Sequence, residues 1–241
     1  MGFIPLRVQV PPRAHFMPRN KLPDKDFEWT SKLAYAIGLL TTDGNLSKDG
    51  VHLEFTSKDK ELVETFRKCL GLKNKIGLKS SGRYREKKYF RVQFGNAVFY
   101  RWLQRIGLCP NKTGKLGELK IPDQYFRDFL RGHLDGDGDI DVYKDYYNTF
   151  KNPKYIYDRI FVRFRSASRR HMEWLRSKIF NILSIKGHLN GEGRNSSKTT
   201  MWILKFGKKD SLKLLSWLYY SPNIPCLKRK RKIAERFIRI E

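Results

Sequence analysis

The chain has 241 residues and a formal net charge of +26 at pH 7, from 50 lysines and arginines against 24 aspartates and glutamates. Repulsion among so many like charges opposes compaction, so the composition predicts a polyanionic partner, with nucleic acid the first candidate and an anionic membrane surface the second. No apolar run approaches the roughly 20 residues that span a bilayer, which argues against a membrane-spanning protein.

Residues 1–28 contain five of the ten prolines and little periodicity, and they predict an N-terminal arm. The start of the chain lacks the long apolar core of a signal peptide, and the three cysteines lie far apart in the sequence. We therefore expect an intracellular protein in a reducing compartment, either a bacterial or archaeal cytoplasm or an organelle.

From residue 29 onward the sequence repeats once. Residues 33–44 read LAYAIGLLTTDG and residues 127–138 read RDFLRGHLDGDG, and each predicts a helix that ends at Asp-Gly. Asp43 and Asp137 lie 94 residues apart (137 − 43). The segments that follow each helix also match, residues 53–66 with 162–175 and residues 89–95 with 201–207.

The repeat predicts the fold. Each copy is expected to run αββαββα, which gives an α+β protein of two pseudo-twofold half-domains with antiparallel sheets and a central pair of repeated helices. We place the half-domains at 29–118 and 119–241, the second with a basic C-terminal helix. Phe55 and Phe164 are offset by 109 residues (164 − 55) rather than 94, so the second copy carries about 15 extra residues in its first hairpin, around 141–159.

Small residues recur every fourth position in both repeated helices. They are predicted to let the two backbones approach closely, which would offset the roughly 1 kcal/mol that a glycine costs inside a helix. The interface residues expected from this pattern are Gly38, Thr42, Gly132 and Gly136.

The aspartates at the helix ends predict a metal site. A carboxylate is disfavoured at a helix C-terminus, and two such carboxylates side by side repel each other, so a divalent cation would relieve both problems. Mg²⁺ suits a site of few carboxylates completed by phosphate and water. We expect the glycine after each aspartate to adopt a left-handed conformation. A calcium loop at 135–146 is disfavoured, because Ile140 and Tyr146 stand where an EF-hand needs glycine and glutamate.

Basic and polar side chains alternate along the predicted strands and are nearly unmixed with acid. A ribbon of such strands can enter the major groove of DNA. The predicted contacts are Lys79, Arg83, Arg85, Lys87, Arg91, Gln93, Arg163, Arg165, Lys198 and Lys205.

AIGLLTTDG at residues 36–44 and LRGHLDGDG at residues 130–138 make the chain resemble the LAGLIDADG homing endonucleases in their single-chain, two-motif form, over roughly residues 29–235. The resemblance implies that Asp43 and Asp137 bind catalytic metal, with Gly44 and Gly138 as further ligands. It implies Mg²⁺, with Mn²⁺ as an alternative and Ca²⁺ as an ion that binds without supporting cleavage. The chain departs from the motif at Thr41 and at His133, which we expect to pack or hydrogen-bond in the helix interface.

The same resemblance implies a basic residue in each active site. Lys112 matches that place in the first copy, and in the second Lys230 is preferred over Lys228 and Lys232. Ser57 and Ser166 stand where a water-positioning residue often lies, although helix capping explains them equally well.

The resemblance thus implies a monomeric, intron-encoded endonuclease that cuts both strands of a long double-stranded DNA site. The alternatives are an RNA maturase that assists splicing of an intron, with or without cleavage, and a DNA-binding regulator that has borrowed the fold.

Overall fold

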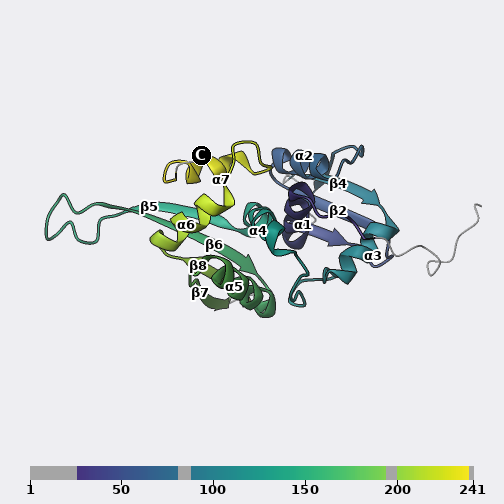
Figure 1. Ribbon diagram of the computed structural model, residues 1–241. Coiled ribbons are helices and arrows are strands. Elements are labelled where there is room, and N and C mark those ends of the chain that lie inside the picture. Colours follow the sequence, from purple (N-terminus) through teal and green to yellow (C-terminus); the bar gives the residue numbers. More distant parts are fainter. Residues whose placement is uncertain (1–25, 81–87, 194–199, 239–241) are drawn as a thin grey trace, which may run out of the picture.

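The computed structural model describes residues 26–80, 88–193 and 200–238, and within them one order of elements occurs twice (Figure 1). The first half runs α1 (Ser31–Asp43), β1 (Gly44–Leu46), β2 (His52–Ser57), α2 (Lys60–Cys69), β3 (Gly77–Ser80), β4 (Lys88–Gly95) and α3 (Ala97–Arg105). The second runs α4 (Asp123–Asp137), β5 (Asp139–Asp145), β6 (Tyr157–Ser166), α5 (Arg169–Leu183), β7 (His188–Gly193), β8 (Thr200–Phe206) and α6 (Lys208–Leu218), and α7 (Lys228–Ala234) follows.

The two halves share one sheet topology. Each sheet is antiparallel, with strand orders β1-β2-β4-β3 and β5-β6-β8-β7, and Phe55 and Phe164 occupy buried places on β2 and β6. The predicted α+β class and duplicated αββαββα order are therefore confirmed. Of the predicted N-terminal arm, residues 1–25 lie outside the described residues, and Phe27 packs edge-on against Phe99, with ring centroids 5.1 Å apart.

Helices cover one face of each sheet. In the first half α2 and α3 pack on β2 and β4, where Leu53, Phe55, Val92 and Phe94 point inward. In the second half α5 and α6 pack on β6, where Val162 and Phe164 point inward. The alternate residues of these strands form the opposite, uncovered face, which we call the open face of each sheet. No helix among the described residues is long and apolar enough to cross a membrane.

Helices α1 and α4 lie side by side between the two sheets (Figure 1). A Cβ atom added to Gly38 would lie 2.8 Å from the backbone nitrogen of His133, and one added to Gly132 would lie 3.0 Å from the carbonyl carbon of Tyr35. Every residue of α1 from Leu33 to Thr41 is buried, because α4 covers one side and the first half covers the other. Glycine is thus required where the two backbones touch.

The helix ends differ from the sequence expectation. Gly44 and Gly138 have φ of −82° and −84°, which is extended backbone and not the left-handed conformation. Strand β1 begins at Gly44 and strand β5 begins directly after Gly138, so in both halves the backbone passes from helix to strand without an intervening loop. A Cβ at Gly44 would lie 2.6 Å from the Leu40 Cα, and one at Gly138 would lie 2.9 Å from the Arg163 carbonyl oxygen. Crowding, not backbone conformation, explains these glycines.

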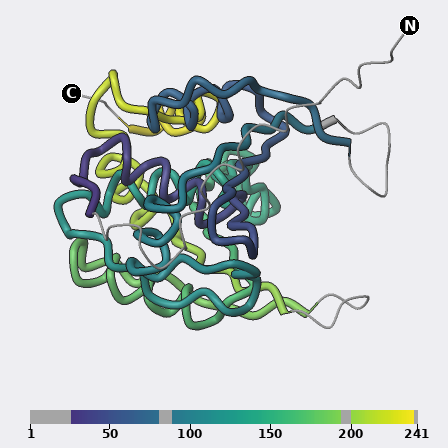
Figure 2. Tube along the Cα trace, turned by 90° about the vertical axis from the view of Figure 1, so that its right-hand side faces the viewer, coloured from purple at the N-terminus to yellow at the C-terminus, as the bar shows by residue number. Residues whose placement is uncertain are grey.

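The C-terminal segment joins the two halves. Arg131 on α4 is fully buried and donates to the carbonyl oxygens of Leu218 and Pro225 and to the carboxylate of Asp128 (2.6 Å). Helix α7 then lies alongside α2 (Figures 1 and 2), where Arg229 pairs with Asp59 at 2.9 Å. Exposed pairs of this kind stabilise little, whereas breaking the buried Arg131 pair would cost several kcal/mol, about 3–5.

The helix contact makes a stability prediction. Gly38→Ala forces a methyl group against the α4 backbone, which cannot move aside as a flexible side chain would, so the two helices must separate. We expect the free energy of unfolding to fall by at least about 2 kcal/mol, measured by urea denaturation.

Gly77→Ala is the matched control, because a Cβ there meets nothing within 4 Å. It should change stability by less than about 0.5 kcal/mol. Equal stability of the Gly38→Ala variant and the wild type would contradict the close helix contact.

Candidate functional site

Two acidic side chains meet where the paired helices end. Asp43 and Asp137 are the last residues of α1 and α4. The helices run parallel, and a Cβ at Gly136 would lie 2.8 Å from the Cβ of Thr42, so their C-terminal turns are in contact. The packing of Gly38, Gly132, Gly136 and Thr42 therefore brings the two carboxylates together.

Loss of solvation disfavours the charged form of both acids, and the charge of Asp137 adds to this at Asp43. Loss of solvation, followed by the charge of Asp137, raises the pKa of Asp43 to about 7. Loss of solvation also raises the pKa of Asp137, against the opposing pull of Lys112 and Lys230. A site that holds two acids against their preference is typical of a functional centre.

Lys112 lies beside the first acid. Its ammonium group donates to the carbonyl oxygen of Gly44, directly after Asp43. Burial lowers the pKa of Lys112 to about 8, although the charges of Asp43 and Asp137 oppose this shift. The lysine lies in the loop that follows α3, the place that the family resemblance implied.

Lys230 occupies the corresponding place in the second half. Its ammonium group donates to the carbonyl oxygens of Leu134 (2.6 Å), Asp135 (2.9 Å) and Gly138 (2.7 Å), at the end of α4. Lys228, by contrast, points outward and lies 3.6 Å from Glu61. All three N–H groups of Lys230 are engaged, so its positive charge is fixed beside the acids.

A pocket opens beside Asp137. Residues from both halves line it: Thr41, Thr42, Lys112, Thr113, Leu116, Asp137, Arg165, Ser166, Ala167 and Met201. Arg165 lies on β6 and Met201 on β8, so the pocket joins the end of the helix pair to the open face of the second sheet. A ligand on that face would reach the carboxylate.

The donor set fits a cation that takes only part of its ligands from protein. Among the described residues no three His, Cys, Asp or Glu side chains gather at one point. The protein offers two carboxylates and the carbonyl oxygens of Gly44 and Gly138, each of which accepts a lysine hydrogen bond but retains a second lone pair. Water and phosphate would have to complete the shell of an Mg²⁺ ion, which commonly binds in this way.

The open face of the first sheet has an acid at its centre. Glu54 accepts from Lys79 (2.5 Å) and from Gln93 (2.7 Å), and Arg91 lies 3.7 Å away. Three predicted contacts therefore share this face, but the expectation of a face nearly free of acid is wrong. Arg83, Arg85 and Lys87 lie outside the described residues.

The open face of the second sheet is also mixed. Arg163 pairs with Asp139 (2.6 Å) and Asp141 (3.2 Å), and Arg165 pairs with Asp139 (3.0 Å). The ammonium group of Lys205 lies 3.9 Å from the centre of the Phe161 ring. These acids come from β5, whose side chains the sequence did not assign to this face, and Lys198 lies outside the described residues. Mixed donors and acceptors suit base edges better than they suit phosphates alone.

Sequence reasoning missed the group that holds Lys230 in place. Asp135 is fully buried and accepts from the Tyr35 hydroxyl and from the backbone N–H of Leu227, both at 2.7 Å. This links α1, α4 and the start of α7. Thr41, the counterpart of Asp135, instead donates to the Ile37 carbonyl of its own helix. Asp135 is the sixth residue of the motif at 130–138, and an acid at this buried helix position was the sequence feature from which such a contact could have been inferred.

Ser57 and Ser166 serve the turns before the helices. Their hydroxyl oxygens accept from the backbone N–H groups of Asp59 (3.2 Å) and Ser168 (3.1 Å), the residues that cap α2 and α5. This local role accounts for both serines.

The sequence expectation that the His133 side chain packs between α1 and α4 is wrong, because only its backbone lies in that contact. The His133 ring stacks on His171 in the core of the second half, with their Nε2 atoms 3.2 Å apart. His171 donates from Nδ1 to the Gly117 carbonyl at 2.8 Å, so His133 must donate from Nε2 and its unprotonated Nδ1 has no partner among the described residues. Burial lowers the pKa of His171 to about 4 and that of His133 well below its usual range.

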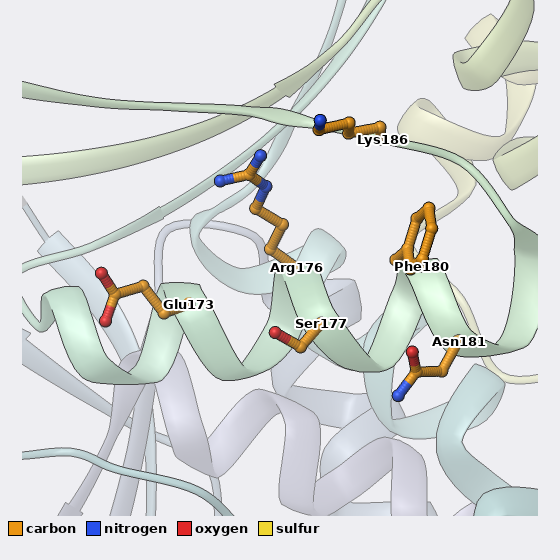
Figure 3. A pocket seen from close by; sticks show the side chains of 6 residues that line it. All are labelled: Glu173, Arg176, Ser177, Phe180, Asn181 and Lys186. Atoms are coloured by element: carbon orange, nitrogen blue, oxygen red, sulfur yellow. The ribbon is translucent and has the colours of Figure 1, made fainter.

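A second hollow lies along α5 and does not include the acids at the helix ends (Figure 3). Glu173, Arg176, Ser177, Phe180, Asn181 and Lys186 line it. It is on the helix-covered side of the sheet and has no paired acids, so we assign it no chemistry.

Comparison with known proteins bears on the fold. No protein-family model matches the sequence, and no curated protein does. The homing endonuclease I-WcaI bound to its DNA recognition sequence has a TM-score of 0.56 at 12% identity, over 86% of this chain and 88% of that one. The LAGLIDADG meganuclease I-AabMI bound to uncleaved DNA has a TM-score of 0.56 at 15% identity, over 84% and 87%. I-DmoI in complex with DNA and Ca has 0.53 at 16%, over 85% and 97%.

The chain therefore has the duplicated fold of the LAGLIDADG homing endonucleases, as the sequence resemblance implied. Full-length DUF199/WhiA from Thermatoga maritima is also similar, with a TM-score of 0.51 at 14% identity, over 92% of this chain and 66% of that one. The fold alone does not define an activity, which must be argued from the site.

The histidine pair predicts a pH dependence of stability. Between about pH 4 and 6.5 the unfolded chain binds protons at these imidazoles and the folded chain does not, so stability falls as the pH is lowered through this range. Each imidazole contributes up to about 1.4 kcal/mol per pH unit to the slope. The His133→Leu/His171→Phe variant should show a shallower loss in urea denaturation at pH 6.5, 5.5 and 4.5.

The control is His188→Gln, which removes an exposed imidazole that water solvates in both states. The loss of stability with falling pH in this variant should have the same slope as in the wild type. A double variant whose slope equals that of the wild type would show that the buried pair does not titrate as described.

Proposed function

We propose that this chain is a monomeric, intron-encoded homing endonuclease that hydrolyses phosphodiester bonds in both strands of a long double-stranded DNA site. One observation carries the proposal: Asp43 and Asp137 end the paired helices beside Lys112 and Lys230, and a pocket lined by Asp137, Lys112 and Arg165 opens at this point toward the second sheet.

In this proposal the open faces of both sheets lie on DNA. Lys79, Arg91 and Gln93 contact one half of the site, and Arg163, Arg165 and Lys205 contact the other, with Arg83, Arg85, Lys87 and Lys198 extending the two sets. The pairing with Glu54 and Asp139 holds the basic side chains in fixed positions before DNA binds. Preorganised side chains lose less entropy on binding, which favours selection of particular bases over general attraction to phosphate.

The acids would hold the divalent cation, with the backbone of Gly44 and Gly138 as further ligands. Mg²⁺ is the proposed ion, Mn²⁺ a substitute, and Ca²⁺ an ion that binds without cleavage. When bound, such an ion neutralises charge on the scissile phosphate and lowers the pKa of a water molecule. Lys112 and Lys230 keep positive charge next to the reacting phosphates, one lysine for each strand, where it favours the developing negative charge.

The same architecture could serve an RNA maturase that assists splicing. Incubation of the chain with a randomised duplex DNA library and Mg²⁺, followed by sequencing of cut ends, separates the two functions. Recovery of one long site cut in both strands supports the endonuclease. If no site is cut and the chain speeds splicing of a cognate intron RNA, the endonuclease proposal is wrong and the maturase is the function.

The acid pair makes a prediction about activity. Asp43→Asn and Asp137→Asn each remove a charge that the cation needs but keep the size of the side chain. We expect each variant to lose double-strand cleavage by more than a hundredfold, in a plasmid assay with the selected site, while its affinity for that site changes by less than about threefold.

Asp123→Asn is the matched control, because this acid begins the same helix α4 but is exposed at its other end. It should cut like the wild type. If Asp43→Asn or Asp137→Asn also cuts like the wild type, that residue does not hold the cation.

A further inference from the structure

The hairpin of β5 and β6 projects beyond the helices of the second half as a two-stranded arm (Figure 1). Its strands stay paired from Asp139 with Arg163 out to Asp145 with Tyr157, and residues 146–156 form the turn. In the first half the corresponding strands are joined by residues 47–51 alone. The extra residues expected from the sequence repeat thus build an arm that the first half lacks.

The arm exposes an unusual number of apolar side chains. They are Tyr143, Tyr146, Tyr147, Phe150, Tyr155, Ile156 and Tyr157. Tyr147 and Phe150 are 80% and 75% exposed, and their rings meet edge to face with centroids 6.4 Å apart. Rings so exposed cannot stabilise the fold, and a contiguous exposed patch of this kind commonly marks an interaction site.

The arm continues the open face of the second sheet. Tyr143 stacks on Phe161, with ring centroids 6.0 Å apart, and the Lys205 ammonium group lies over the same Phe161 ring. The charged strip of Arg163 and Arg165 therefore passes without a break into the aromatic strip of the arm. A ligand that covers the open face reaches the arm next.

The tip of the arm is basic. Lys151 lies 5.5 Å from the Phe150 ring centre, and neither Lys151 nor Lys154 has a carboxylate partner among the described residues. Nearer the sheet, Arg159 is paired with Asp145 at 2.8 Å, which ties the two strands together. Lysines left unpaired beside exposed rings suit a phosphate backbone with apolar sugar and base edges beside it.

We propose that the β5–β6 arm binds duplex DNA beyond the segment that the sheets cover, so that the footprint of the chain is longer at the second half than at the first. This inference rests on the proposed endonuclease function. From Phe161 to Tyr157 the strands rise by roughly 13 Å at about 3.3 Å per residue. That distance corresponds to about four base pairs, before the turn adds its own reach. Phe150 and Tyr147 act as the apolar wedge with which β-ribbon arms pack into a minor groove.

The test uses the duplex selected from the randomised library, extended by ten base pairs at each end and bound in EDTA so that it stays intact. Duplexes shortened stepwise from either end are titrated with the wild type and with Tyr147→Ser/Phe150→Ser. Shortening at one end alone should raise the wild-type Kd roughly tenfold. The double variant should bind the long duplex roughly tenfold more weakly and lose nothing further on shortening.

Phe180→Ser is the matched control, because Phe180 is also an exposed ring (50%) but lies on helix α5, away from the arm (Figure 3). It should behave as the wild type does. A second variant, Lys151→Ala/Lys154→Ala, should lower the slope of log Kd against log salt concentration by up to about 2. Both variants change only exposed side chains, and their melting temperatures check that they fold.

The outcomes separate the arm from the proposed function. Specific binding by the wild type, with identical Kd values for Tyr147→Ser/Phe150→Ser on every duplex, would overturn the arm's role and leave the endonuclease intact. The arm's role in DNA binding would also be overturned if the double variant kept wild-type DNA binding but lost self-association or RNA binding. Absence of specific binding to any duplex by the wild type would instead remove the proposed function itself.

Discussion

The close approach of α1 and α4 at Gly38 and Gly132 is the contact on which the rest of the structure depends. Two backbones in direct contact leave no room for sliding or rotation, so the register of one helix fixes that of the other. Each helix leads directly into the first strand of its own sheet. The contact therefore sets where the two sheets lie and where the two helices end.

The electrostatics of the site follow from that register. Parallel helices bring two C-terminal ends together, and with them Asp43 and Asp137, whose charged forms are each disfavoured by the helix dipole and by loss of solvation. Lys112 and Lys230 supply the compensating charge, and both donate to carbonyl oxygens at the helix ends. The buried link from Tyr35 through Asp135 to Leu227 holds the segment that carries Lys230. Apolar side chains packed at the ends of α1 and α4 would stabilise the fold more than the charged groups that form the pocket there.

Much of this could be predicted from the sequence because it depends on periodicity and repetition. The αββαββα order, the paired helices and the longer second hairpin follow from comparing one copy with the other, whereas the place of Lys112 was implied by the family resemblance. The sequence could not show that Glu54 and Asp139 lie among the basic side chains, because that depends on strand register. Nor could it show the Asp135 and His133 contacts, which join residues 92 and 38 positions apart, or that crowding rather than a left-handed turn requires Gly44 and Gly138.

In the proposed site, two acids at the ends of paired helices share a divalent cation. Anomalous diffraction from crystals of the chain with its selected DNA and Mn²⁺ tests this most directly, because it locates the metal without reference to activity. We expect anomalous peaks beside the carboxylates of Asp43 and Asp137, between the helix ends and the DNA backbone. Peaks elsewhere, with both carboxylates lacking metal, would contradict it.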